Sequence, residues 1–80
     1  MFKLKHETVT IEGQEITVRE LSAGEIFEIP EDADKSHVVA ACWVAPGDVT
    51  ADDVRSWPMR AVEQIYEICA KLMGLEQGND

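Results

Sequence analysis

The sequence predicts an α+β fold in which an N-terminal antiparallel β-hairpin, or a three-stranded meander, is followed by three or four helices, the last one long. Three features predict it. Apolar and polar residues alternate around a glycine near the start, helix-capping spacings recur in the middle, and apolar residues repeat at helical spacing near the end. A chain of 80 residues has room for one modest core. We therefore expect a single domain over residues 1–75 and a disordered polar tail over residues 76–80.

Residues 8–19 predict the hairpin, because β-branched and polar residues alternate on both sides of Gly13 and Gln14. If these two residues form the loop, Gly13 supplies the positive φ that a type II′ turn requires. The resulting register puts four apolar residues on one face, as the opposed pairs Ile11–Ile16 and Val9–Val18. A sheet with one apolar face must be covered, and the helices are the only cover available.

Two other segments bear on the number of strands. Phe2 and Leu4 alternate with lysines, which indicates a short strand before the hairpin and would complete a meander. Residues 35–45 contain a continuous apolar run that suits either a buried strand or a helix enclosed on most sides. Periodicity does not decide between the two, but Asp34 or Ser36 as an N-cap favours the helix.

Short helices are predicted at two places where the sequence has the residue spacing of a capping box. Ser22 and Glu25 have this spacing, and so do Thr50 and Asp53. Pro30 ends the first of these helices, and an acidic loop over residues 28–34 follows it.

The long helix is predicted over residues 58–75. Pro58 suits its first turn, and Gly74 is typical of a left-handed stop. Its apolar face is broader than one neighbouring element needs, so a groove on it could accept a partner helix. From the helical pattern alone we predict the partner-binding residues Ile65, Tyr66, Cys69, Leu72 and Met73.

Trp43 and Trp57 bracket the turn that follows the ambiguous apolar segment. One interpretation is that both anchor this turn to the core. The other is that one of them belongs to an exposed apolar patch of adaptable side chains. Further candidates for this patch are Met59, Tyr66, Met73 and Phe27.

The net charge is −9, and most of it lies between Ser22 and Val54, where eight acids are opposed only by Lys35. Such a field repels nucleic acid and anionic membranes and favours basic partners or solubility. The N-terminus has no signal-peptide pattern, and the longest apolar run, residues 38–46, is too short to span a bilayer. We expect a cytoplasmic protein whose small core a partner or a second copy of the chain would stabilise.

No catalytic, metal or phosphate-binding motif is present, so we expect neither an enzyme nor a cofactor. His6, His37, Cys42 and Cys69 lack the close pairing of structural zinc sites. Both cysteines lie in apolar helical patterns, which favours buried, reduced thiols.

The order of segments resembles a known family. ITVRELSAGEI at residues 16–26 is followed by an acidic loop, an apolar VVAACWV stretch, TADDVRSWP and a terminal EQIYEICAKLMGL helix. In this order, over residues 9–75, the chain resembles the small tail assembly chaperones of long-tailed bacteriophages and prophages.

The resemblance implies a non-enzymatic protein that coats the helical tape-measure protein before the tail tube polymerises around it, and that helps to recruit tail tube subunits. It implies a site of action in the cytoplasm of the bacterial host and absence from the mature virion. The alternative from another class is an acidic nucleic-acid mimic or inhibitor that occupies a basic protein surface. A mimic should lose its partner at high salt, whereas a chaperone that holds its client through apolar contacts should keep it. A structural tail component, a third alternative, would be found in mature particles.

Overall fold

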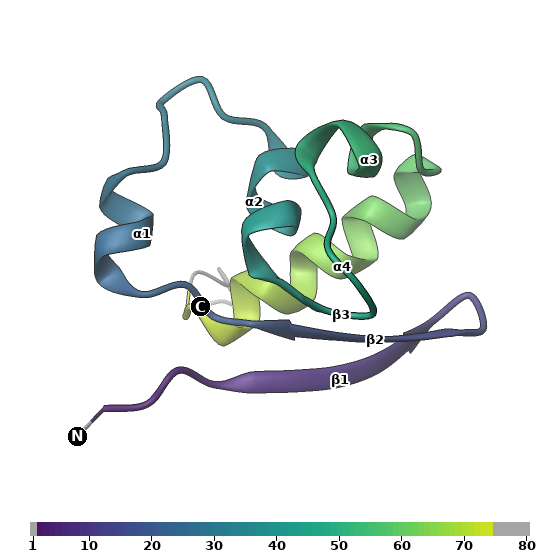
Figure 1. Cartoon of the computed structure of the whole chain (residues 1–80), viewed down its shortest axis with the longest axis horizontal. Helices are drawn as coiled ribbons and strands as arrows, with labels where there is room; N and C mark the ends of the chain where they lie inside the picture. The colour runs from purple at the N-terminus through teal and green to yellow at the C-terminus, as the bar shows by residue number, and fades with distance from the viewer. Residues whose placement is uncertain (1, 75–80) are drawn as a thin grey trace, which may run out of the picture.

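The computed structural model describes residues 2–74 and confirms the α+β class, with a three-stranded antiparallel sheet and a long last helix (Figure 1). Leu75 and the tail predicted over residues 76–80 lie outside the described residues. The elements follow one another as β1 His6–Ile11, β2 Gln14–Arg19, α1 Ala23–Phe27, α2 Lys35–Cys42, β3 Trp43–Ala45, α3 Ala51–Arg55 and α4 Met59–Leu72.

The hairpin is present, but its loop is one residue earlier than predicted. Glu12 and Gly13 form the loop, with φ values of 51° and 83°. Positive φ at both positions is the geometry of a type I′ turn, whose twist matches that of the flanking strands. The predicted register was therefore wrong: Val9 lies opposite Ile16, and Ile11 lies opposite Gln14. The two registers differ by two residues, so the apolar residues of both strands still share one face.

The strand predicted around Phe2 and Leu4 does not form, and the third strand comes from the apolar segment over residues 35–45. Residues 2–5 form no strand, and β3 instead pairs antiparallel with β2, so that β2 is the central strand. The apolar segment that suited either a helix or a strand contains both. α2 is capped by Asp34 and ends at Cys42, after which Trp43 adopts an extended conformation and begins β3.

The capping signals mark the helix starts as predicted. Both predicted capping boxes are formed, at the beginning of α1 and of α3. Pro58 is the N-cap of α4 rather than a residue of its first turn. α4 ends at Leu72, three residues before the predicted end, and Gly74 has the expected positive φ of 74°.

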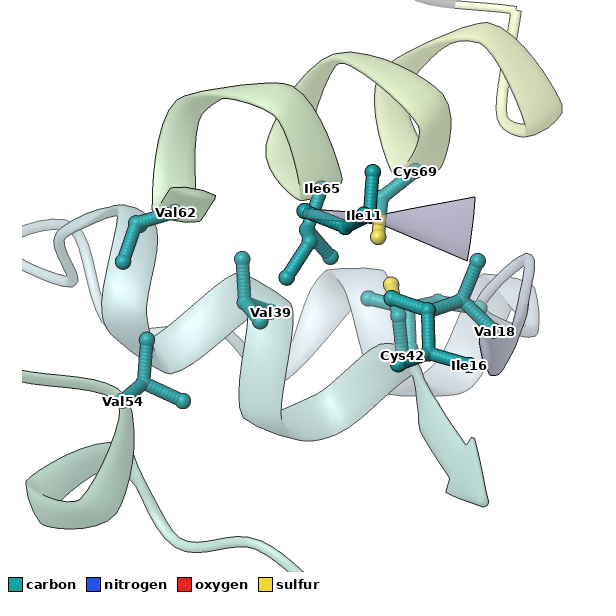
Figure 2. Close-up of a cluster of buried hydrophobic side chains, with 10 residues drawn as sticks. Ile11, Ile16, Val18, Val39, Cys42, Val54, Val62, Ile65 and Cys69 are labelled. Atoms are coloured by element: carbon teal, nitrogen blue, oxygen red, sulfur yellow. The ribbon is translucent and has the colours of Figure 1, made fainter. Parts of the chain in front are cut away.

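The helices cover one face of the sheet, with α4 running across it and α2 packed against α4 (Figure 1). α3 packs on α2, whereas α1 is set apart and contributes no buried residue. Figure 2 shows how the core side chains converge from the sheet, α2, α3 and α4. The core consists of Ile11, Ile16, Val18, Leu21, Val39, Cys42, Val54, Val62, Ile65 and Cys69.

Candidate functional site

The structure separates the predicted partner-binding residues of α4 into two groups. Ile65 is 3% exposed and Cys69 is 0% exposed, so neither side chain is available to a partner in the folded chain. Tyr66, Leu72 and Met73 are partly buried at the margin of the core. Their partner-binding role stays a prediction.

The breadth of the apolar face of α4 has an internal explanation. One part of this face packs against α2, and another lies on β1 and β2. A helix that contacts both a neighbouring helix and a sheet needs a wide apolar stripe. The stripe is therefore used mostly within the fold.

An open hollow of about 540 Å³ lies instead where α2, α3 and α4 approach one another. Its apolar walls come from α3, the start of α4 and the link between them: Val54 and Val62 are buried, Trp57 is partly buried, and Met59 is 65% exposed. Its polar lining comes from the start of α2 and the end of α3, and consists of Asp34, Lys35, Ser36 and Arg55.

Trp57, which lines the hollow, packs against the ring of Trp43 at the start of β3. The ring centroids of Trp43 and Trp57 are 5.3 Å apart with a tilt of 53°, an arrangement that aromatic pairs favour. The Trp43 indole N–H donates a hydrogen bond of 2.9 Å to the carbonyl oxygen of Pro46. Both tryptophans pack against the core, as the first interpretation predicts, and Trp57 also lines the hollow. A place for either ring in an exposed binding patch stays a prediction.

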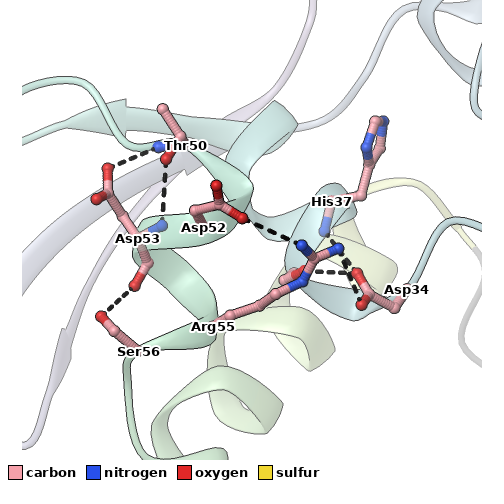
Figure 3. A network of polar contacts seen from close by, with 8 residues as sticks. Asp34, His37, Thr50, Asp52, Asp53, Arg55 and Ser56 are labelled. Carbon is pink, nitrogen blue, oxygen red and sulfur yellow. Dashed lines mark hydrogen bonds and ion pairs between the residues drawn. The ribbon is translucent and has the colours of Figure 1, made fainter.

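A polar network forms the rim between α2 and α3 (Figure 3). The Asp34 carboxylate caps α2 by accepting from the backbone N–H of His37 at 3.2 Å. The Arg55 guanidinium donates to Asp34 at 3.3 Å and to Asp52 at 3.2 Å. The hydrogen bond from the Ser36 hydroxyl, followed by the His37 N–H and the Arg55 charge, lowers the pKa of Asp34. The carboxylate therefore stays ionised, but its pair with Arg55 is more than half exposed and orients the side chains without adding much stability.

Lys35 links the opposite side of the rim to α4. Its ammonium group lies 3.6 Å from the Glu63 carboxylate and 5.2 Å from the centre of the Tyr66 ring. Both partners of this ion pair are about half exposed, so the pair orients the side chains but adds little stability. The arrangement suits an apolar group that enters the hollow, with polar neighbours that meet the charged rim.

Sequence reasoning missed the hollow because three separate segments form it. Asp34 ends the acidic loop, Val54 lies in α3, and Met59 opens α4. The one residue in the sequence that pointed to the hollow was Met59, which directly follows Pro58 and was a candidate for the exposed apolar patch. Phe27, another candidate for that patch, is 82% exposed but lies on α1, away from the hollow.

Within residues 2–74, no group of three or more His, Cys, Asp or Glu side chains is placed to hold a metal ion. None of the described helices is both long and apolar enough to cross a membrane. Comparisons with protein-family models, with curated proteins and with solved structures found no match.

Proposed function

We propose that this chain is a non-enzymatic tail assembly chaperone of a long-tailed bacteriophage or prophage. In this role it binds the tape-measure protein in the cytoplasm of the bacterial host and helps to recruit tail tube subunits. It leaves before the virion is mature. The resemblance over residues 9–75 supports the class of protein, and the hollow supports a binding role for it.

The observation that carries the proposal is an apolar hollow on a strongly acidic protein. Its volume of about 540 Å³ is in the range of small ligand pockets and has room for bulky apolar side chains from one face of a helix. Met59 is flexible and two-thirds exposed, and Trp57 offers a ring beside it. Adaptable residues of this kind serve surfaces that accept several related segments, as a long repetitive client requires.

The charges beside the hollow favour a client helix with basic residues. The loop over residues 28–34 carries four acids and no base, and it leads directly into Asp34 on the rim. A client helix could place an apolar residue in the hollow and a lysine or arginine against this loop. The net charge of −9 would also keep copies of the chaperone apart on a shared client.

The test is capture of the client by a tagged chain from cells during phage or prophage induction, with identification by mass spectrometry after low-salt and high-salt washes. Met59→Asp places a charge in the hollow, and an acid suits the first turn of a helix, so the fold should persist. Phe27→Asp is the matched control, because it places the same charge on an exposed apolar residue of α1.

We expect the parent chain and Phe27→Asp to retain a very long, helix-rich phage protein at both salt concentrations, and Met59→Asp to lose it. Equal capture by both variants would contradict the assignment of the hollow.

The nucleic-acid mimic remains the second candidate because of the acidic loop over residues 28–34. It predicts a different outcome of the same experiment. Basic DNA-binding proteins would be recovered at low salt, lost at high salt, and unaffected by Met59→Asp.

A further inference from the structure

The two cysteines form a facing pair in the core. Cys42 lies on α2 and Cys69 on α4, and Figure 2 shows their sulfur atoms pointing toward each other between the two helices. Both side chains are 0% exposed, and both thiols are free. Their contact therefore joins two elements that are distant in sequence.

The surroundings make the two thiols unequal. The facing thiol of Cys42 raises the pKa of Cys69, and burial raises it further. The facing thiol of Cys69 lowers the pKa of Cys42 by more than burial raises it, and the nearby charge of Arg19 lowers it as well. Cys42 is thus the sulfur that becomes a thiolate first, and Cys69 is the one that follows.

Both cysteines also lie where their helices end. Cys42 is the last residue of α2, and Cys69 lies in the last turn of α4, which ends at Leu72. Oxidation of these thiols would therefore require only local opening of the two helix ends, which costs less free energy than opening of helix centres. A disulfide then requires the two facing sulfurs to approach to a bond length of about 2 Å.

We propose that Cys42 and Cys69 are a site of reversible oxidation, at which a small-molecule disulfide converts the two thiols into an intramolecular disulfide between α2 and α4.

The reaction is two successive thiol–disulfide exchanges. The Cys42 thiolate attacks one sulfur of the small disulfide and forms a mixed disulfide, while the other sulfur leaves and takes up the Cys42 proton. Cys69 then attacks the Cys42 sulfur and expels the second small thiol, which takes up the Cys69 proton. Two protein thiols are oxidised, and one small disulfide is reduced to two thiols.

The bridge would fix the ends of two helices whose starts line the hollow. α2 and α4 both contribute lining residues, and the closed loop between the cysteines contains β3 and α3. Closing a loop of this length restricts the unfolded chain, so we expect the melting temperature to rise by about 10 °C or more.

The test equilibrates the full chain with mixtures of reduced and oxidised glutathione, stops the exchange with acid, and blocks the remaining thiols with a maleimide in denaturant. We expect intact mass spectrometry to show a monomer that has lost two hydrogens and carries neither maleimide nor glutathione. In native buffer this product should form at a ratio of oxidised to reduced glutathione about tenfold or more below that needed in urea. The reason is linkage: if the bridge stabilises the folded state, the folded state stabilises the bridge by the same free energy.

Cys42→Ala and Cys69→Ala each leave one thiol, and under oxidation each should stop at a mixed disulfide with no rise in melting temperature. The proposal is overturned if the parent chain stops at glutathione adducts or forms disulfide-linked dimers. It is equally overturned if the bridge lowers the melting temperature or forms as readily in urea. All of these measurements on the parent chain stand even if an alanine variant fails to fold.

Discussion

The Arg19 guanidinium donates two parallel hydrogen bonds to the Glu25 carboxylate, at 2.9 and 2.8 Å, and so ties α1 to the central strand β2. α1 has no buried residue of its own. Glu25 also accepts the backbone N–H of Ser22 at 2.8 Å and completes the capping box of α1. α1 therefore holds its place through polar contacts, most of which converge on one carboxylate.

Acid should weaken this attachment over a defined pH range. The Arg19 hydrogen bonds, followed by the Ser22 N–H, lower the pKa of Glu25 from 4.5 to about 2. Because the pKa is lower in the folded state, the contribution to stability is complete above pH 4.5 and is lost as the pH falls toward 2. Urea unfolding at several pH values should show a smaller decline across this range in Glu25→Gln than in the parent chain. Identical pH profiles would show that Glu25 is not linked to folding.

The hairpin loop sets backbone strain against an ion pair. Glu12 has a φ of 51°, which favours asparagine or glycine, and its carboxylate also accepts from the Arg60 guanidinium at 3.1 Å. Relief of the strain is worth about 1 kcal/mol, and an ion pair as exposed as this one contributes little against it. Glu12→Asn should therefore raise the free energy of unfolding by about 0.5 kcal/mol in urea titrations.

Arg60→Gln, made alone and together with Glu12→Asn, isolates the ion pair in this comparison. A loss of stability of about 1 kcal/mol in Glu12→Asn would mean that the Arg60 pair outweighs the strain.

Ile65 and Met59 lie on the same helix but should respond differently to truncation. Ile65→Ala removes a side chain that is 3% exposed and should cost about 2–4 kcal/mol of unfolding free energy. Met59→Ala changes a side chain that is 65% exposed and should stay within about 0.5 kcal/mol. Ile65→Asp should unfold the chain, which circular dichroism would show as lost helical signal. A folded Ile65→Asp that fails to bind a client would restore Ile65 as a surface residue.

The two capping boxes should differ in their effect on global stability. Thr50→Ala removes the cap of α3, whose Val54 is fully buried, and should cost about 1 kcal/mol. Ser22→Ala removes the cap of α1, which buries nothing, so its cost should appear as faster hydrogen exchange of α1 amides. The free energy of global unfolding should then fall less in Ser22→Ala than in Thr50→Ala. Equal losses in both variants would show that α1 unfolds together with the core.

The sequence was sufficient where a local rule decides the outcome. Both capping boxes, the left-handed Gly74 and the alternation of the hairpin are read from residues a few positions apart. The turn was misplaced because one glycine satisfies either the first position of a type II′ turn or the second position of a type I′ turn. The twist of the sheet and the pairing of β2 with β3 decide between them, and neither is a local property.

The candidate site was harder to predict because it depends on which apolar residues the fold buries and which it leaves exposed. The pattern of α4 identified an apolar face, but the pattern does not show that α2 and the sheet cover Ile65 and Cys69. The hollow needs the end of a loop, α3 and the start of α4 to meet, which is a tertiary arrangement. Met59, exposed after a proline cap, was the one local signal of it.

The central claim, that the hollow binds a helical client, is tested most directly by nuclear magnetic resonance. Helical peptides from a tape-measure protein, the proposed client, would be titrated into the labelled protein. We predict that the largest shifts fall on Lys35, Val54, Met59 and the indole N–H of Trp57, and that Met59→Asp abolishes them. Shifts confined to α1 or to the acidic loop, or titrations unchanged by Met59→Asp, would contradict the account.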